Sequence, residues 1–382
     1  AENCTNYAAL VLMNDFEKPA FIKLGKAEDI EKLTTLTPDK IYSESPVSQE
    51  LYDKIWAPII NVAPTVKKII FSPAGVLNKL AIEQLYNGKK RVCESYELMR
   101  VTSTREICRR TPQYEYASAV LYGGLKYDEN IDTMIAESRS VRGDKSSISE
   151  RFRGYTSSTT RKGWDYLPGT LSEVNEVSSI ISKGHVSHSL YSAEKGNEES
   201  FKALSGNRFD ILHIATHGFY MTETQASRSD YFTSNPFMGN NLNASTSSLY
   251  RSGLMMSGGN KAWVGETLPE DIEDGILSAA EISNLDFNSC DIVVLSACET
   301  GLGEITDEGV FGLQRSFKIA GVNTIIMSLW EVDDQATSYM MQNFYKNLVK
   351  GKNKREAFSI AQAAVKKKYS DPRYWAAFIM LD

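Results

Sequence analysis

Three stretches decide the fold: FDILHIATHG (209–218), DIVVLSACETG (291–301) and NTIIMSLWEVDD (323–334). Each begins as a continuous apolar run and ends in polar residues, which is typical of central parallel strands buried on both faces. Helical patterns cover 309–321, 335–351 and 354–370, and YWAAFIML (374–381) is a last predicted strand. The alternation predicts an α/β fold in which helices flank a mostly parallel sheet.

The chain before these stretches divides into two predicted parts. Residues 1–112 show two strands across an Asn14-Asp15 turn, a helical pattern from Ser48 and further strands, which together predict a separate first lobe. The α/β alternation restarts with ASAVLYGG (117–124), so we place a second domain at 113–382. Two domains suit a chain of 382 residues.

A stretch with little periodicity, residues 125–165, is predicted to be a long exposed loop. It is rich in basic side chains: Arg139, Arg142, Arg151, Arg153, Arg161 and Lys162. We consider two hypotheses for it, a segment that the protein itself cleaves during activation and a solvated loop without function.

Composition narrows the classes of function. Hydrophobic residues make up 42% of the chain and charged residues 24%, as in ordinary globular proteins. The net charge of −6 disfavours nucleic acid as a direct partner. We find no signal peptide and no apolar run near 18 residues, so we expect no membrane contact. The odd number of cysteines suits a reducing compartment, so we expect a cytoplasmic location. Five cysteines without paired spacing suggest neither a zinc site nor a disulfide framework.

His217 and Cys298 follow two of the three central strands, and each has a glycine close behind it. The carboxyl ends of parallel strands meet at one sheet edge, where reactive groups gather. A cysteine nucleophile needs a base and oxyanion donors, and the backbone amides of Gly218 and Cys298 could be those donors. The ordinary alternative is a core cysteine and a structural histidine. From the pattern alone both readings stay open.

Other candidates for chemistry are weaker. His213 and Cys290 have the positions of structural residues in their strands, and nothing places His185 or His188 near Cys298. The sequence has no G-x-S-x-G elbow and no phosphate-binding glycine motif. Ala297-Cys298 fits a caspase signature, but His217 lies 81 residues upstream rather than about 50. We attribute the surplus to an inserted polar stretch at 220–253.

Motifs along nearly the whole chain resemble the CHAT family of caspase-like proteases, which are often attached to tetratricopeptide repeats. The motifs are WAPI (56–59), SPAGVL (72–77), LPGT with SEV (167–174), HIATHG (213–218), RSGLMMSGG (251–259), DGILSAAEI (274–282), VVLSACETGLGE (293–304), GVFGLQRSFKIAGV (309–322), SLWEVDD (328–334) and YWAAFIML (374–381). The resemblance implies a Cys298–His217 dyad without metal or organic cofactor. It also implies a separase-like architecture, in which residues 1–112 form an inactive caspase-like lobe before the catalytic domain.

The same resemblance suggests a protein or peptide as substrate and a repeat or sensor module as a possible partner on the N-terminal side. Because the sequence begins at Ala1, we interpret it as the edge of a larger protein, although a stand-alone form is not excluded. A catalytically silent scaffold that binds partners is the main rival function, and a small-molecule hydrolase with the same dyad is a third.

Four acids are candidates for a substrate pocket that accepts a basic residue. Glu331, Asp333 and Asp334 follow the third central strand, and Glu299 follows Cys298. A buried guanidinium needs a carboxylate partner, so these acids predict cleavage after arginine, or after lysine. Separase has a similar acidic stretch that reads arginine, and by that match we favour Asp334. The alternative is that Asp333 or Asp334 caps the following helix.

Overall fold

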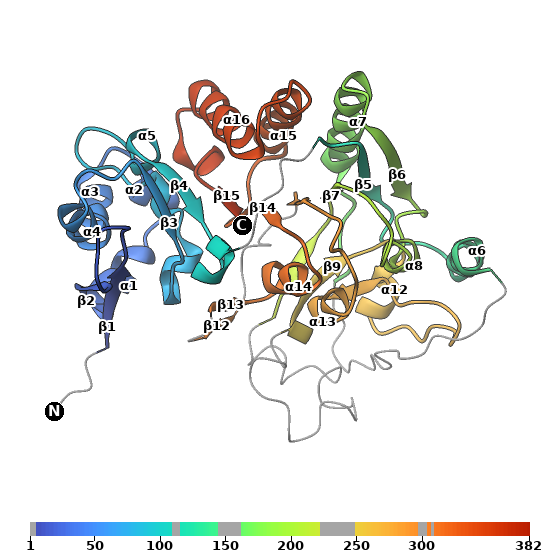
Figure 1. Ribbon diagram of the computed structural model, residues 1–382. Helices are drawn as coiled ribbons and strands as arrows, with labels where there is room; N and C mark the ends of the chain where they lie inside the picture. The colour runs from blue at the N-terminus through green and yellow to red at the C-terminus, as the bar shows by residue number, and fades with distance from the viewer. Residues whose placement is uncertain (1–4, 109–114, 144–161, 222–248, 297–303, 307–308) are drawn as a thin grey trace.

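A computed structural model describes residues 5–108, 115–143, 162–221, 249–296, 304–306 and 309–382, shown as coloured ribbon in Figure 1. An eight-stranded sheet runs through the molecule in the order β3-β4-β15-β14-β11-β7-β5-β6. Its strands are parallel to their neighbours except where β14 meets β15. They span Lys68–Phe71 (β3), Glu97–Arg100 (β4), Ser118–Leu125 (β5), Ser187–Ala193 (β6), Ile211–Ile214 (β7), Ile292–Leu295 (β11), Thr324–Ser328 (β14) and Phe378–Leu381 (β15). The predicted mostly parallel α/β sheet is confirmed.

The three central strands end in register. Leu295 of β11 lies opposite Ile214 of β7 on one side and Met327 of β14 on the other. The segments that follow these strands therefore leave the sheet at one edge. All residues of β7, β11 and β14 are buried, as their continuous apolar runs require.

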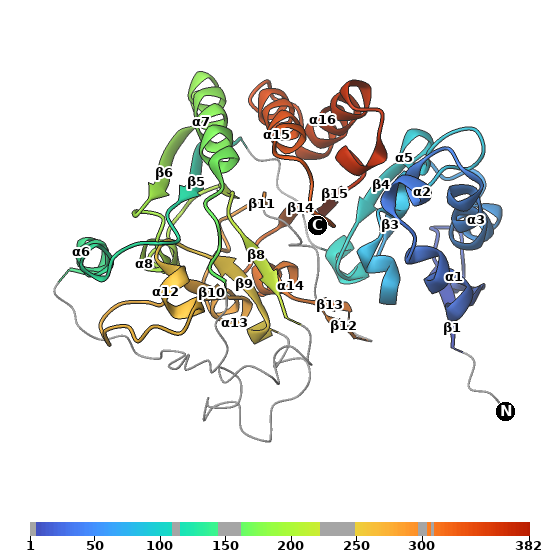
Figure 2. The same ribbon diagram turned by 180° about the vertical axis from the view of Figure 1, so that it is seen from behind.

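Helices cover both faces of the sheet (Figures 1 and 2). Side chains alternate between the faces of a strand, so His213 of β7 points to one layer and its neighbours point to the other. His213 contacts Tyr345 of α15 and Glu173 of α7, whereas Tyr122 of β5 packs on Phe201 of α8 on the opposite face. The helices are α7 (Pro168–Lys183), α15 (Asp334–Leu348) and α16 (Lys354–Lys368) in one layer, with α8 (Glu198–Lys202), α13 (Ala279–Ser283) and α14 (Leu313–Ile319) in the other.

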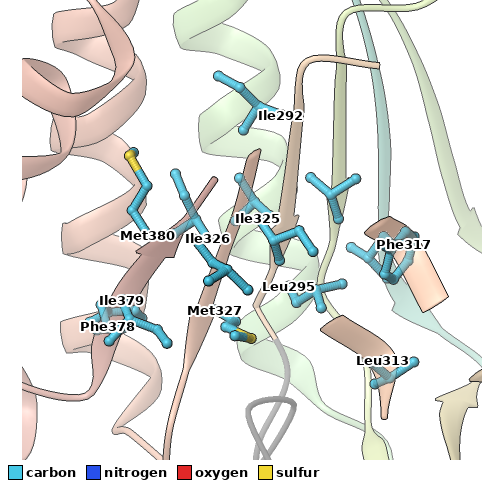
Figure 3. Close-up of a cluster of buried hydrophobic side chains, with 14 of the residues drawn as sticks. Ile292, Leu295, Leu313, Phe317, Ile325, Ile326, Met327, Phe378, Ile379 and Met380 are labelled. Atoms are coloured by element: carbon cyan, nitrogen blue, oxygen red, sulfur yellow. The ribbon is translucent and has the colours of Figure 1, made fainter. Parts of the chain in front are cut away.

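The centre of the sheet is filled by aliphatic and aromatic side chains. Figure 3 shows this cluster, in which β11, β14, β15 and α14 meet, and labels Ile292, Leu295, Leu313, Phe317, Ile325, Ile326, Met327, Phe378, Ile379 and Met380. All ten side chains are buried. Burying an aliphatic or aromatic side chain of this size contributes about 1.5–3 kcal/mol to stability, so the cluster holds the strand ends firmly in place.

Residues 1–112 contribute strands to the same sheet. The predicted first hairpin is present, with β1 (Asn6–Val11) antiparallel to β2 (Ala20–Lys26). The strands β3 and β4 continue the large sheet, since Arg100 of β4 lies opposite Leu381 of β15. The remaining elements are α1 (Ala27–Thr34), α2 (Pro38–Tyr42), α3 (Pro46–Ile55), α4 (Ala57–Val62), η1 (Gly75–Lys79), η2 (Ile82–Gln84), α5 (Val92–Ser95) and η3 (Thr104–Cys108). The division at residue 112 into an inactive lobe and a catalytic domain stays a prediction.

The segment 125–165 is not the continuous loop that the sequence predicted. Helix α6 (Ile131–Arg142) begins after Asn130, whose side chain accepts a hydrogen bond from the Thr133 amide, and ends at Gly143 with φ of 66°. Ser138 is the buried residue of this helix. A helix with so little apolar surface leaves no 3.6-residue pattern to detect. Residues 144–161 lie outside the described residues, so the self-cleavage hypothesis is not addressed.

Short strands after His217 form a second sheet that the sequence analysis did not anticipate. Its order is β10-β9-β8, and the central strand β9 (Ser252–Met255) is antiparallel to both β8 (Gly218–Tyr220) and β10 (Ile276–Ser278). A short helix, α12 (Gly259–Trp263), follows β9. The smaller elements η5 (Pro372–Tyr374), β12 (Glu304–Thr306) and β13 (Gly309–Phe311) complete the description. Within the described residues, no helix is both long and apolar enough to cross a bilayer.

Candidate active site

His217 lies between β7 and β8, at the sheet edge where the central strands end. Its half-buried ring packs against Trp164 and Tyr127, with ring centroids 4.8 Å and 5.1 Å away. Its Nε2 lies 2.8 Å from the backbone oxygen of Asp165. Because a carbonyl oxygen can only accept, Nε2 carries a proton and donates it. In the neutral ring, Nδ1 is then the nitrogen able to accept a proton.

The surroundings of His217 favour its neutral form. Burial lowers the pKa of His217, and this effect outweighs the hydrogen bond to Asp165 and the negative charges of Asp165 and Glu331, which act in the opposite direction. A histidine that is neutral near pH 7 can take a proton from a thiol, which is the first requirement of a general base.

The amide of Gly218 faces away from its neighbouring strand. The backbone amide of Met255 donates to His217 O, and the backbone amide of Met221 donates to Arg251 O. Every second residue from His217 to Met221 therefore bonds to the β9 side, and the residues between them face away from it. By that alternation the Gly218 amide points to the edge of β8 opposite β9, where no other described strand pairs with it. A backbone N–H group in this position could bind a negatively charged oxygen.

The chain approaches the same place from β11. Ser296 donates its amide to Ile214 O at 2.9 Å, and it lines one pocket together with His217 and Gly218. Cys298, the predicted nucleophile and second oxyanion donor, lies outside the described residues, as does Glu299. Their place in the site therefore stays a prediction. Cys290 is buried at the opposite end of β11, and burial raises the pKa of its thiol, which disfavours the reactive thiolate.

The pocket beside His217 has a volume of about 520 Å³. Three acids line it, and none of the described lining residues is lysine or arginine. Two of the acids, Glu331 and Asp334, were predicted from the sequence. The third, Glu173, was missed: it lies on α7 and is 4% exposed.

Asp334 is the first residue of α15, and its carboxylate packs against the backbone of Gly169, where a Cβ atom would collide with it. Partial burial raises the pKa of Asp334, and the nearby charges of Glu173, Asp333 and Glu331 raise it further. The described part of the chain offers Asp334 no cation. A positively charged ligand group would relieve this mutual repulsion.

Asp333 is not among the described residues that line the pocket, and its predicted role in substrate binding stays a prediction. Its Oδ1 accepts the amides of Gln335 and Ala336 at 3.0 Å and 3.1 Å, so it caps α15. The cap that the sequence analysis had considered for either acid belongs to Asp333. Asp334 is thereby left free to face the pocket.

Glu173 belongs to a buried polar group behind the pocket. Its Oε1 lies 2.9 Å from Nε2 of His213, within ion-pair distance but without the alignment of a regular hydrogen bond. Nδ1 of His213 lies 3.1 Å from the Tyr345 hydroxyl. His213 is thus structural, as expected. One feature of the sequence could have revealed Glu173: it is an acid on the otherwise apolar, buried face of α7. The sequence analysis did not use this feature.

The sequence is similar to one family model and to two known proteins. The family model of the CHAT domain matches residues 45–382. The chain belongs to the CHAT domain family. It is 30% identical to tetratricopeptide repeat protein 28 from Homo sapiens over 112 residues, and 31% identical to the protein of that name from Mus musculus over 110 residues. These matches cover 29% and 28% of this chain, which spans 4% of the length of each relative.

This member of the CHAT family also superposes, with low TM-scores, on solved structures whose sequences differ widely from its own. Gingipain R, an Arg-specific cysteine proteinase, superposes with a TM-score of 0.46 at 8% identity, over 93% of this chain and 69% of that one. Separase in the Saccharomyces cerevisiae separase–securin complex gives 0.42 at 12% identity, over 97% and 21%.

Proposed function

We propose that this chain is a cysteine endopeptidase in which Cys298 is the nucleophile and His217 its base. The observation that carries the proposal is the state of His217, whose Nε2 proton is held by the Asp165 carbonyl at 2.8 Å beside a pocket at the carboxyl ends of β7, β11 and β14. Family membership adds support, because the CHAT model extends over both proposed catalytic residues.

In the proposed reaction Nδ1 of His217 takes the thiol proton of Cys298, and the sulfur attacks the carbonyl carbon of the scissile peptide bond. The carbonyl oxygen becomes negative and accepts hydrogen bonds from the amides of Gly218 and Cys298. His217 then protonates the departing amine, which leaves an acyl-enzyme. Water, deprotonated by His217, hydrolyses the thioester and restores the thiol. The proton balance closes without a metal or a cofactor.

We further propose that the residue before the cut is arginine or lysine. Support comes from the acids Glu173, Glu331 and Asp334 around the pocket and from the lack of a lysine or arginine among its described lining residues. Glu299 remains a proposed contributor. A guanidinium entering this pocket would form charge-assisted hydrogen bonds that a neutral side chain cannot.

An attached repeat or sensor module that regulates the peptidase is a further part of the proposal. Its support is the match to tetratricopeptide repeat protein 28, of which this chain spans 4% of the length. The inactive-lobe role of residues 1–112 is proposed on the same family grounds.

Covalent labelling tests the dyad directly. A peptidyl chloromethyl ketone ending in arginine should alkylate Cys298, as mass spectrometry of the digested protein would report, and a matching reagent ending in aspartate should label it far more slowly. We expect Cys298→Ala to remove labelling and peptide turnover, and His217→Ala to lower both by at least about 100-fold. A folded parent protein that neither reagent labels would instead fit a partner-binding scaffold.

A further inference from the structure

Asn260 is the second residue of α12, the short helix that begins at the end of the RSGLMMSGG motif, and the proposed reaction gives it no role. It is 3% exposed, and its backbone amide donates to Tyr127 O at 3.1 Å. The turn before it contains Gly258 in the left-handed region, with φ of 82°. A glycine there avoids the strain that another residue would carry. The position of Asn260 is therefore fixed by its own amide and by the turn before it.

The side-chain amide of Asn260 binds both backbone groups of Trp164. Its Oδ1 accepts the Trp164 amide at 2.7 Å, and its Nδ2 donates to Trp164 O at 2.9 Å. Nδ2 also donates to Oδ1 of Asp128 at 2.9 Å, so both of its hydrogens are used. The preceding residue, Gly163, approaches closely enough that a Cβ atom there would lie 3.0 Å from Nδ2. Two parallel hydrogen bonds to one residue restrict how that residue can rotate.

Trp164 and the next residue make two direct contacts with His217. The indole of Trp164 packs on the imidazole at 4.8 Å, and the Asp165 carbonyl accepts the Nε2 proton at 2.8 Å. The Trp164–Asp165 peptide plane contains the oxygen that Asn260 binds. Asn260 thus sits one peptide unit from the group that decides which imidazole nitrogen is protonated.

We propose that Asn260 is a positioning residue for His217: by holding the Trp164 backbone it keeps the Asp165 carbonyl in place, and so it fixes the Nε2–H tautomer of the imidazole. Its catalytic meaning rests on the proposed peptidase function. The claim that Asn260 fixes the tautomer of His217 does not depend on that function, because the tautomer can be measured without a substrate. Loss of the correct tautomer lowers turnover severely in enzymes that use a histidine base.

The experiment compares variants of the full chain by NMR of ¹⁵N-labelled histidine, with His217→Gln used to assign the resonance. In the parent protein His217 should show a single Nε2–H tautomer with a slowly exchanging proton. In Asn260→Ala we expect a mixture of tautomers and at least tenfold faster exchange of that proton. Asn260→Asp keeps the acceptor for the Trp164 amide but lacks the donor to Trp164 O. In this variant the tautomer mixture and the exchange rate of His217 should change in the same direction.

Asp128→Ala is the matched control. It removes one hydrogen bond of Asn260 but leaves both bonds to Trp164, so His217 should keep its tautomer and exchange rate. An unchanged His217 in folded Asn260→Ala and Asn260→Asp proteins would overturn the proposal, and so would an equal change in Asp128→Ala. If the parent turns over peptides, kcat should fall roughly 10- to 100-fold in Asn260→Ala with KM within about twofold. If the tautomer shifts but the parent has no turnover, the positioning role stands and the peptidase proposal fails.

Discussion

Asp333 and Asp334 are adjacent acids with different surroundings, and this difference allows a controlled test of substrate preference. Asp334→Asn should lower kcat/KM for peptides cut after arginine by about tenfold, because the guanidinium would lose a charge-assisted hydrogen bond, which is commonly worth about 1.5–3 kcal/mol. Asp333→Asn removes the same charge but keeps a good helix cap, so activity should stay within about twofold. Fluorogenic peptides that differ only in the residue before the cut would measure both. Full arginine preference in Asp334→Asn would contradict the assignment.

The titration of His217 gives a second prediction at this scale. Since burial lowers the pKa of His217, the imidazole should lose its proton below pH 6.5, the ordinary histidine value. The unfolded chain then binds the proton at a higher pH than the folded one, so this group favours folding above pH 6.5 and disfavours it as the pH falls below that value. NMR titration of Cys298→Ala, which lacks the thiol, should show a midpoint below 6.5. A midpoint at or above 6.5 would contradict this.

Some residues of the pocket could be predicted from the sequence and others could not. His217, Gly218, Glu331 and Asp334 meet at one pocket as the strand-end argument predicted. The sequence analysis missed Glu173, Trp164, Asp165 and Asn260 because they come from α7, from the segment before it and from the short helix α12. Their proximity to His217 depends on how distant segments pack, which strand periodicity cannot report.

The stability of helix α15 depends on the cap at its N-terminus. Its N-cap is Asp333, and we expect Asp333→Ala to lower the free energy of unfolding by about 1 kcal/mol, because two amides lose their acceptor. Urea titration followed by far-ultraviolet circular dichroism would measure this. Asn353→Ala removes the comparable cap of α16 at a distance from the pocket and should cost a similar amount. A change below about 0.3 kcal/mol for Asp333→Ala, with a normal loss for Asn353→Ala, would argue against the cap.

The elements that the sequence predicted well share a strong pattern. β7, β11 and β14 are continuous apolar runs, and α7, α15 and α16 have long amphipathic faces with polar caps or a terminal glycine. The elements that it missed are short or lack a core face, such as α6 and the three-stranded sheet of β8, β9 and β10. Tertiary contacts stabilise such elements, and a local pattern does not reveal them.

At the scale of the molecule, residues 1–112 touch the loop that carries the pocket acids. Tyr42 of α2 stacks on Trp330 with ring centroids 5.5 Å apart, and the indole Nε1 of Trp330 donates to Arg373 O at 3.0 Å. Trp330 directly precedes Glu331, which lines the pocket. Tyr42 is therefore linked to the pocket segment through the side chain of Trp330.

Removing that side chain should affect substrate recognition. We expect Trp330→Ala to lower kcat/KM for arginine peptides by about tenfold, because the segment 331–334 loses its anchor, and Trp330→Phe to retain most activity through the remaining ring contact. Stopped assays over a peptide panel would compare them. Equal activity of parent and Trp330→Ala, with both folded, would show that the stack does not support the pocket.

The position of β15 has a consequence for how this protein is made. β15 joins β14 to β4, yet among the eight strands of the sheet it is the last that a ribosome would synthesise. Neither β4 nor β14 can form hydrogen bonds on the side of β15 until residues 378–381 have been synthesised. A nascent chain that stalls earlier would expose two unpaired strand edges, which are sites where other chains add on. Chaperone binding should therefore concentrate on nascent chains in which β4 and β14 have been made but β15 has not.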